Sequence, residues 1–164
     1  MKRVALVLAI VFACGVLNAT MAQTVVNQGT IGNCSWVLTG DSVLTISGSG
    51  DMVDYEAEKE APWYEHRYAV KTIVVGNAVT SIGNRAFSHC VNMTSVVIGN
   101  SVATIGKSAF YHCRNLQSVT IPESVTSIGS LAFVLCSNLT EANVPESVTV
   151  NESAFQGCKN LQKK

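Results

Sequence analysis

The sequence predicts a solenoid of about four 23-residue coils, built from short parallel β-strands, turns and short helical segments, behind an N-terminal β-rich cap. Three observations predict it. An Ala-Phe pair recurs at regular intervals, a cysteine follows each of these phenylalanines by three residues, and apolar residues alternate where each unit opens. The units are residues 71–93, 94–116, 117–139 and 140–161, the last being one residue shorter. Because so short a unit cannot bury its own apolar face, we expect the units to stack on one another.

Each unit opens with an L-x-x-L-x-L type of pattern, followed by a Gly-Asn or Pro-Glu turn and a second apolar pair. The alternation places Val96 and Ile98 on the core face and Val97 on the opposite face. A glycine precedes each Ala-Phe segment in the first three units, and Asn151 takes its place in the fourth, where its tolerance of left-handed backbone would keep a bend. In-register stacking predicts parallel ladders and a column of the recurring rings: Phe87, Phe110, Phe133 and Phe155.

The repeating pattern V-x-x-I-G-x-x-A-F-x-x-C-x-x-L, followed by x-x-V-x-I-P, resembles the BspA-like (Treponema pallidum-type) leucine-rich repeat, and residues 71–161 carry it almost without gaps. Residues 29–70 resemble the module that often precedes such repeats. The resemblance implies a leucine-rich repeat solenoid of the kind found in bacterial surface proteins and some protist ones, with adhesion or protein binding as the usual role. A fold does not by itself fix a function.

Residues 1–22 are typical of a secretory signal peptide. A short positive region, Lys2-Arg3, precedes an uncharged apolar stretch, and small or polar residues lead to a cleavage position after Ala22. The less favoured alternative is a lipoprotein signal that uses Cys14. The apolar stretch is short for a membrane span, and no later segment approaches spanning length. We therefore expect a secreted or cell-surface protein in three parts: signal peptide 1–22, cap 23–70 and repeat array 71–164.

The composition excludes some classes of partner. Eleven Lys and Arg balance eleven Asp and Glu, and 48% of the residues are hydrophobic. Such a chain folds, and it lacks the basic stripe that nucleic-acid binding needs. We expect no nucleic-acid partner.

Short strands are expected in the cap at 36–38, 43–46 and 52–53, with residues 48–51 as the turn between the last two. The aromatic residues Trp63, Tyr64 and Tyr68 are interpreted as a cover for the first coil, because such rings bury large areas. The alternative is a patch on which a sugar or another ligand stacks. No comparable cap follows the fourth unit, so its strand edge is expected to be open for pairing with another chain.

Cysteines and histidines invite two further hypotheses. Four of the cysteines outside the signal occupy one ladder position, where stacked β-carbons are too far apart for an easy disulfide, so we interpret them as buried thiols. The fifth, Cys34, lies in the cap. Adjacent units contain matching His-Cys pairs, but neighbouring residues project differently and the later units lack the histidines, so we predict no metal site. The ladder cysteines are Cys90, Cys113, Cys136 and Cys158.

No catalytic motif accompanies the repeats. The sequence has no nucleophile elbow, zinc-protease motif, phosphate-binding loop or dinucleotide fingerprint. His66 in the cap has no nucleophile placed beside it by any motif. We predict no enzyme and no cofactor, with a hydrolase that depends on His66 as a minor alternative.

A binding scaffold is the leading hypothesis, with a protein or cell-surface ligand as partner. If the first strand of each unit lines the inner face, its outward positions form a strip across the coils, which solenoids often use for extended contacts. The alternative is an assembly module that self-associates or docks through the open C-terminal coil. The candidate strip, called the outer strip below, comprises Thr72, Val74, Ser95, Val97, Ser118, Thr120, Glu141 and Asn143.

Overall fold

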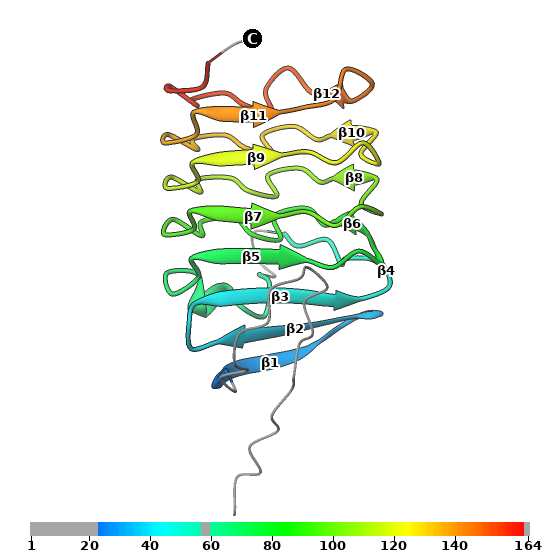
Figure 1. Cartoon of the computed structure of the whole chain (residues 1–164), viewed down its shortest axis with the longest axis vertical. Coiled ribbons are helices and arrows are strands. Elements are labelled where there is room, and N and C mark those ends of the chain that lie inside the picture. The colour runs from blue at the N-terminus through cyan, green and yellow to red at the C-terminus, as the bar shows by residue number, and fades with distance from the viewer. Residues whose placement is uncertain (1–22, 57–59, 163–164) are drawn as a thin grey trace, which may run out of the picture.

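The structure is a computed structural model, and it describes residues 23–56 and 60–162. The chain winds into a stack of flat coils, with the N-terminal hairpin strands at one end and the fourth unit at the other (Figure 1). The elements are β1 Val25–Ile31, β2 Cys34–Thr39, β3 Val43–Gly48, β4 Gly50–Asp51, the 3₁₀ turn η1 Tyr64–His66, β5 Thr72–Val75, β6 Val79–Ile82, β7 Ser95–Val97, β8 Thr104–Ile105, β9 Ser118–Thr120, β10 Ser127–Ile128, β11 Glu141–Asn143 and β12 Thr149–Val150.

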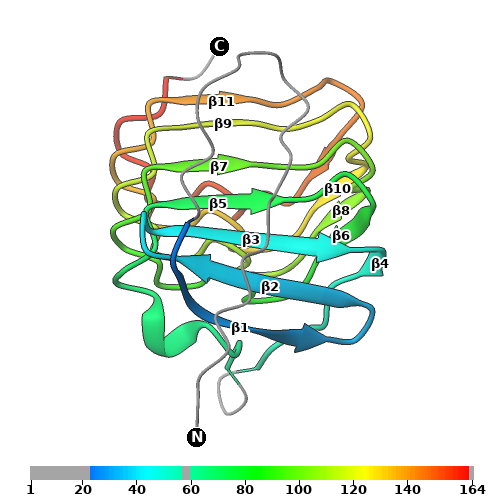
Figure 2. The same cartoon turned by 60° about the horizontal axis from the view of Figure 1, so that its bottom comes forward.

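Two walls of strands run along the stack. One contains the sheet β1-β2-β3-β5-β7, continued by the separate pair β9-β11, and the other is the sheet β12-β10-β8-β6-β4. Every described pairing between strands of the repeat units is parallel and joins equivalent positions, such as Thr72 with Ser95 and Ser118 with Glu141. The predicted leucine-rich repeat solenoid with in-register stacking is therefore confirmed. Figure 2 shows the two walls from a second direction.

The recurring phenylalanines form the centre of the core. Ring centroids are 5.4 Å apart for Phe87 and Phe110, 5.0 Å for Phe110 and Phe133, and 5.0 Å for Phe133 and Phe155. The planes become nearly parallel along the column, from 26° in the first pair to 2° in the last. The first three rings are fully buried. The predicted column of rings is confirmed, and each buried ring contributes about 3–5 kcal/mol when judged by truncation to alanine.

The short helical segments predicted within the units are wrong. The stretch from the glycine to the cysteine forms turns instead, and its N–H groups bond to the next coil: Phe87 donates to Ala109 and His89 to Tyr111, each at 2.8 Å. The cause is left-handed backbone, with φ of 56° at Arg85 and 63° at His89, which ends any right-handed helical turn. The equivalent residues also have positive φ: Ser108, His112, Leu131, Leu135 and Gly157.

The glycine before each Ala-Phe segment is needed for a different reason from the one expected. Its φ is not positive, but a Cβ added at Gly106 would lie 2.7 Å from the backbone nitrogen of Asn84, and one at Gly129 would lie 2.8 Å from that of Lys107. Close approach of successive coils therefore selects glycine. Asn151 keeps the same backbone hydrogen bond, donating to Ile128 at 3.0 Å as Gly129 donates to Ile105 at 2.8 Å.

The cap supplies an antiparallel hairpin and the first parallel strand of the stack. β1, which the sequence did not predict, pairs with β2, and β2 pairs with β3. The side chains of β1 are mostly exposed. The segment therefore lacks the alternation of apolar and polar residues that predicts a strand. β3 then pairs in parallel with β5. The strand expected at 52–53 lies instead at 50–51, as β4.

The predicted signal segment 1–22, including Cys14, lies outside the described residues. Among the residues that are described, no helix is long and apolar enough to cross a bilayer.

Candidate functional site: the outer strip and the corner of the stack

The predicted outer strip lies on the wall formed by β5, β7, β9 and β11, which are stacked beside one another in Figures 1 and 2. Register aligns Thr72 with Ser95 and Val74 with Val97 in one half of the strip. In the other half it aligns Ser118 with Glu141 and Thr120 with Asn143. No backbone pairing is described between β7 and β9, so the strip consists of two registered halves that meet at this step.

The strip side chains point outward because the residues next to them in each strand point into the core. Ile73 and Val119 are buried, whereas Val97 between its own neighbours is 55% exposed. The Thr72 and Ser95 hydroxyls hydrogen-bond across the first step at 3.1 Å, and Asn143 donates to Glu141 Oε1 at 3.2 Å. The surface is therefore mostly polar, contains one carboxylate, and has one exposed apolar side chain near its centre.

The outer strip continues into the cap, which was not predicted from the sequence. Through β3, Val43 lies beside Thr72, and Thr45 lies beside Val74. The hydroxyls of Ser35 and Ser47 then join across the β2–β3 pair at 2.9 Å. The signal was present in the sequence, since 43–46 has the same alternation as 72–75.

Histidines and tyrosines gather at the corner of the stack, in the turns that precede β7 and β9. The rings of His89 and His112 lie 5.2 Å apart, and Tyr111 lies 5.3 Å from His89. Tyr64 of the cap meets His89 edge-on at 6.4 Å. Burial lowers the pKa of both histidines, and their arginine neighbours lower it further.

The corner histidines do not share a ligand sphere with their neighbouring cysteines. Cys90 and Cys113 point into the core, while His112 Nε2 accepts a hydrogen bond from Arg114 Nε at 2.7 Å. In residues 23–56 and 60–162, no group of three or more His, Cys, Asp or Glu side chains is placed to hold a metal ion.

The aromatic residues of the cap do not all cover the first coil. Trp63 is buried, stacks on Phe87 at 5.7 Å and donates from Nε1 to Ala86 O at 2.8 Å, as a cover for the first coil should. Tyr68 is 57% exposed, so the covering role predicted for it is wrong. The reason is Arg67, whose guanidinium lies 4.0 Å from the Tyr64 ring and 4.3 Å from the Tyr68 ring and holds them at the surface.

His66, the residue of the minor hydrolase alternative, lies in η1 and hydrogen-bonds through Nε2 with the side-chain amide of Asn27 at 2.9 Å. Its partner is an amide rather than a hydroxyl or thiol nucleophile, which gives the alternative no geometric support.

The ladder thiols do more than fill space. Cys113 Sγ donates to Phe87 O at 3.2 Å, Cys136 Sγ to Phe110 O at 3.3 Å and Cys158 Sγ to Phe133 O at 3.1 Å. Each bond joins a coil to the coil before it. Burial raises the pKa of Cys90 to about 12, so this thiol stays protonated and unreactive at neutral pH.

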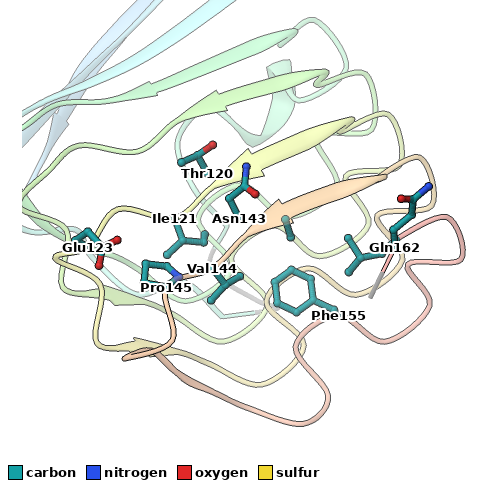
Figure 3. Close-up of a pocket in the computed structure, with 10 residues that line it drawn as sticks. Thr120, Ile121, Glu123, Asn143, Val144, Pro145, Phe155 and Gln162 are labelled. Carbon is teal, nitrogen blue, oxygen red and sulfur yellow. The ribbon is translucent and has the colours of Figure 1, made fainter. Parts of the chain in front are cut away.

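The fourth unit borders an apolar depression of about 640 Å³, shown in Figure 3. Phe155 forms one wall and is only partly buried, unlike the three rings before it. Val144, Pro145 and Leu161 add further apolar surface.

Comparisons with known proteins agree with this architecture. The BspA type leucine-rich repeat region matches residues 62–164, in six copies. A leucine-rich repeat protein from Eubacterium ventriosum has 30% identity and a TM-score of 0.62, with 80% of this chain and 41% of that chain covered. The Treponema pallidum leucine-rich repeat protein has 22% identity and a TM-score of 0.58, with 79% and 66% covered. The chain thus spans about two-fifths and two-thirds of their lengths. No curated protein matches it in sequence.

Proposed function

The chain belongs to the BspA-type leucine-rich repeat family, and from this premise we propose that it is an exported, non-catalytic scaffold that binds a protein or cell-surface ligand through the outer strip. The observation that carries the proposal is the outward alignment of the strip positions in two registered halves, β5 with β7 and β9 with β11. Within each half, a partner would meet positions spaced about 4.8 Å apart. Because hydrogen-bonded strands hold these positions, binding would require little ordering of the scaffold.

The chemistry of the strip favours a folded protein surface as the partner. Its hydroxyl and amide groups both donate and accept hydrogen bonds, and Val97 offers an apolar contact near the centre. The single carboxylate, Glu141, adds little long-range attraction. We therefore expect specificity from shape and hydrogen bonding, and a binding constant that depends weakly on salt.

Substitution at the centre of the strip tests the proposal. The purified protein and its Val97→Arg variant would be applied to an array of extracellular and cell-surface proteins. Thr104→Arg is the matched control, because Thr104 is also exposed on a strand but lies on the opposite wall, in β8. Saturable signals that Val97→Arg loses and Thr104→Arg keeps would support the strip. Signals that both variants keep, or lose equally, would contradict it.

Export is part of the proposal and has its own test. N-terminal sequencing of the protein recovered from the culture medium or cell surface should begin at Gln23. A chain that retains Met1 and stays in the cytoplasm would contradict export, and a lipidated Cys14 at the N-terminus would replace secretion with membrane anchoring.

A second candidate function is assembly through the fourth unit. The partly exposed Phe155 and the depression beside it favour it, because another copy could extend the ring column there. Light scattering across a concentration series decides between the two. A constant mass of one chain supports the independent scaffold. A mass that rises with concentration, and no longer rises in Leu161→Lys, supports assembly.

A further inference from the structure

A pocket of about 450 Å³ lies at the corner of the stack, on a surface separate from the outer strip. The turns that form it are those before β7 and β9, together with the cap segment that follows η1, and they lie on the same side of the molecule in both views (Figures 1 and 2). We call it the corner pocket. The residues used below are Tyr68, His89, Asn92, His112, Arg114 and Asn115.

Aromatic rings form one wall of the corner pocket. Tyr68 exposes 57% of its surface, and its position is fixed by Arg67, which donates from Nη2 to the Tyr68 hydroxyl at 3.1 Å and from Nη1 to Tyr64 O at 2.8 Å. Asn92 Nδ2 donates to Tyr68 O at 2.8 Å and ties the same residue to the next coil. An exposed ring held in this way is a preorganised stacking surface.

The polar groups that remain free in the corner pocket are mostly donors. Arg114 uses Nε for His112, and its two terminal nitrogens form no hydrogen bond with the described residues. Asn115 Oδ1 accepts from Asn138 at 3.2 Å, and the Asn115 NH₂ group donates to no described residue. His89 Nδ1 lies 2.8 Å from the Ser88 hydroxyl, so with that hydroxyl as donor the ring carries its proton on Nε2.

Among residues 23–56 and 60–162, no carboxylate lines the corner pocket. Burial and the neighbouring His112, Arg85 and Arg67 lower the pKa of His89, and Glu60 opposes them by raising it. Burial and the positive charge of Arg114 lower the pKa of His112. An arginine whose two terminal nitrogens have no described partner, in a pocket that no described acidic residue lines, is suited to a carboxylate, which it can bind in bidentate fashion.

We propose that the corner pocket binds an acidic sugar, a ring that carries one carboxylate and several hydroxyls. The carboxylate would accept hydrogen bonds from Arg114 and His89, the hydroxyls would pair with the amides of Asn92 and Asn115, and the apolar face of the ring would lie on Tyr68. A sugar fits better than an acidic peptide for two reasons. The pocket has the volume of a small-ligand site, and it combines an exposed ring with two amides, which a carboxylate side chain alone would leave unused.

This inference goes beyond the protein-binding function proposed for the outer strip, and the two can fail separately because they share no residue. The corner pocket would direct the scaffold to acidic glycans, while the outer strip would contact a protein.

Nuclear magnetic resonance titration of the purified protein tests the proposal. The probes are methyl β-D-glucuronide and methyl β-D-glucoside, which differ only in having a carboxylate or a hydroxymethyl group, and a capped triglutamate peptide as the acidic-peptide arm. The variants are Arg114→Gln and Tyr68→Ala. The matched control is Lys159→Gln, which removes the positive charge at the equivalent position of the fourth unit. Thermal unfolding of each variant verifies that it is folded.

The glucuronide is expected to shift the signals of His89, His112 and Asn115 and to saturate in the millimolar range, with the glucoside at least about tenfold weaker. Arg114→Gln and Tyr68→Ala should each weaken glucuronide binding by about tenfold or more, and Lys159→Gln should leave it unchanged. Equal binding of glucoside and glucuronide would overturn the proposal, as would absence of binding. Triglutamate binding that matches the glucuronide and is unaffected by Tyr68→Ala would replace the sugar with an acidic peptide.

Discussion

The indole of Trp63 stacks on the ring of Phe87, with centroids 5.7 Å apart and planes 25° from parallel, so the cap contributes the first member of the aromatic column. The indole Nε1–H also donates to Ala86 O at 2.8 Å. Tyr55 and Trp36 pack against Trp63 edge-on. A single side chain thus joins the antiparallel hairpin to the parallel repeats.

Truncation of the Trp63 side chain should destabilise the whole chain. Trp63→Ala removes a fully buried ring and should lower the free energy of unfolding by about 3–5 kcal/mol. Trp63→Phe keeps a ring on Phe87 but loses the bond to Ala86 O, and should cost about 1–2 kcal/mol. Urea unfolding monitored by circular dichroism measures both. Equal losses in the two variants would mean that stacking on Phe87 contributes little.

Close packing of the coils gives a second prediction. Gly106→Ala places a methyl group 2.7 Å from the Asn84 backbone nitrogen and should cost about 1–3 kcal/mol, because the backbones of two coils must separate. Gly40→Ala is the matched control, since its new methyl would lie 3.5 Å from the nearest atom, the Thr24 carbonyl oxygen. The two variants would be compared by urea unfolding. If they lost equal stability, close approach would not explain the glycine.

Thiol reactivity should follow burial. Cys158 is partly exposed, whereas Cys34, Cys90, Cys113 and Cys136 are buried. A maleimide reagent should therefore label Cys158 first in the native protein, and the other four thiols only after denaturant is added. Mass spectrometry of the labelled peptides identifies the order. Disulfide-linked ladder cysteines, or early labelling of Cys113, would contradict the described thiol contacts.

Acid should weaken the corner of the stack. Burial lowers the pKa of His89 and His112 in the folded chain below the usual 6.5, so the unfolded chain binds more protons. Their contribution to stability is therefore fully present above pH 6.5 and is lost as pH falls through the lowered values. Unfolding free energies at about pH 7.5 and about pH 5 should differ less in the His89→Gln, His112→Gln double variant than in the wild type. Both proteins contain the same carboxylates, so the effect of carboxylate titration on the unfolding free energy is common to them and cancels in the comparison.

The sequence was sufficient to predict the coils because period and chemistry coincide. Each Ala-Phe-x-x-Cys segment has only one way to bury its ring, and the equal spacing forces Phe87 onto Phe110 and so on along the column. The backbone of these segments could not be predicted. The residue before each cysteine has positive φ, yet it is histidine, histidine, leucine and then glycine, and only Gly157 indicates that geometry by its residue type.

The candidate sites were predictable to different degrees. The outer strip followed from alternation alone, but its continuation through Thr45 needed the parallel pairing of β3 with β5, which joins segments that the sequence treats as separate parts. The 23-residue period places Asn92 beside Arg114 and Asn115 in adjacent units, but nothing in the sequence indicates that Tyr68 of the cap meets them. Side chains from successive coils converge only after the register is fixed.

We expect the outer strip, on the wall of β5, β7, β9 and β11, to be the protein-binding surface. The most direct measurement is the dissociation constant of an array-identified protein partner for the wild type, Val97→Arg and Thr104→Arg, by biolayer interferometry. Val97→Arg should weaken binding by about tenfold or more, equivalent to at least about 1.4 kcal/mol, while Thr104→Arg should bind as the wild type does. Unchanged binding by Val97→Arg, or equal weakening by Thr104→Arg, would contradict it.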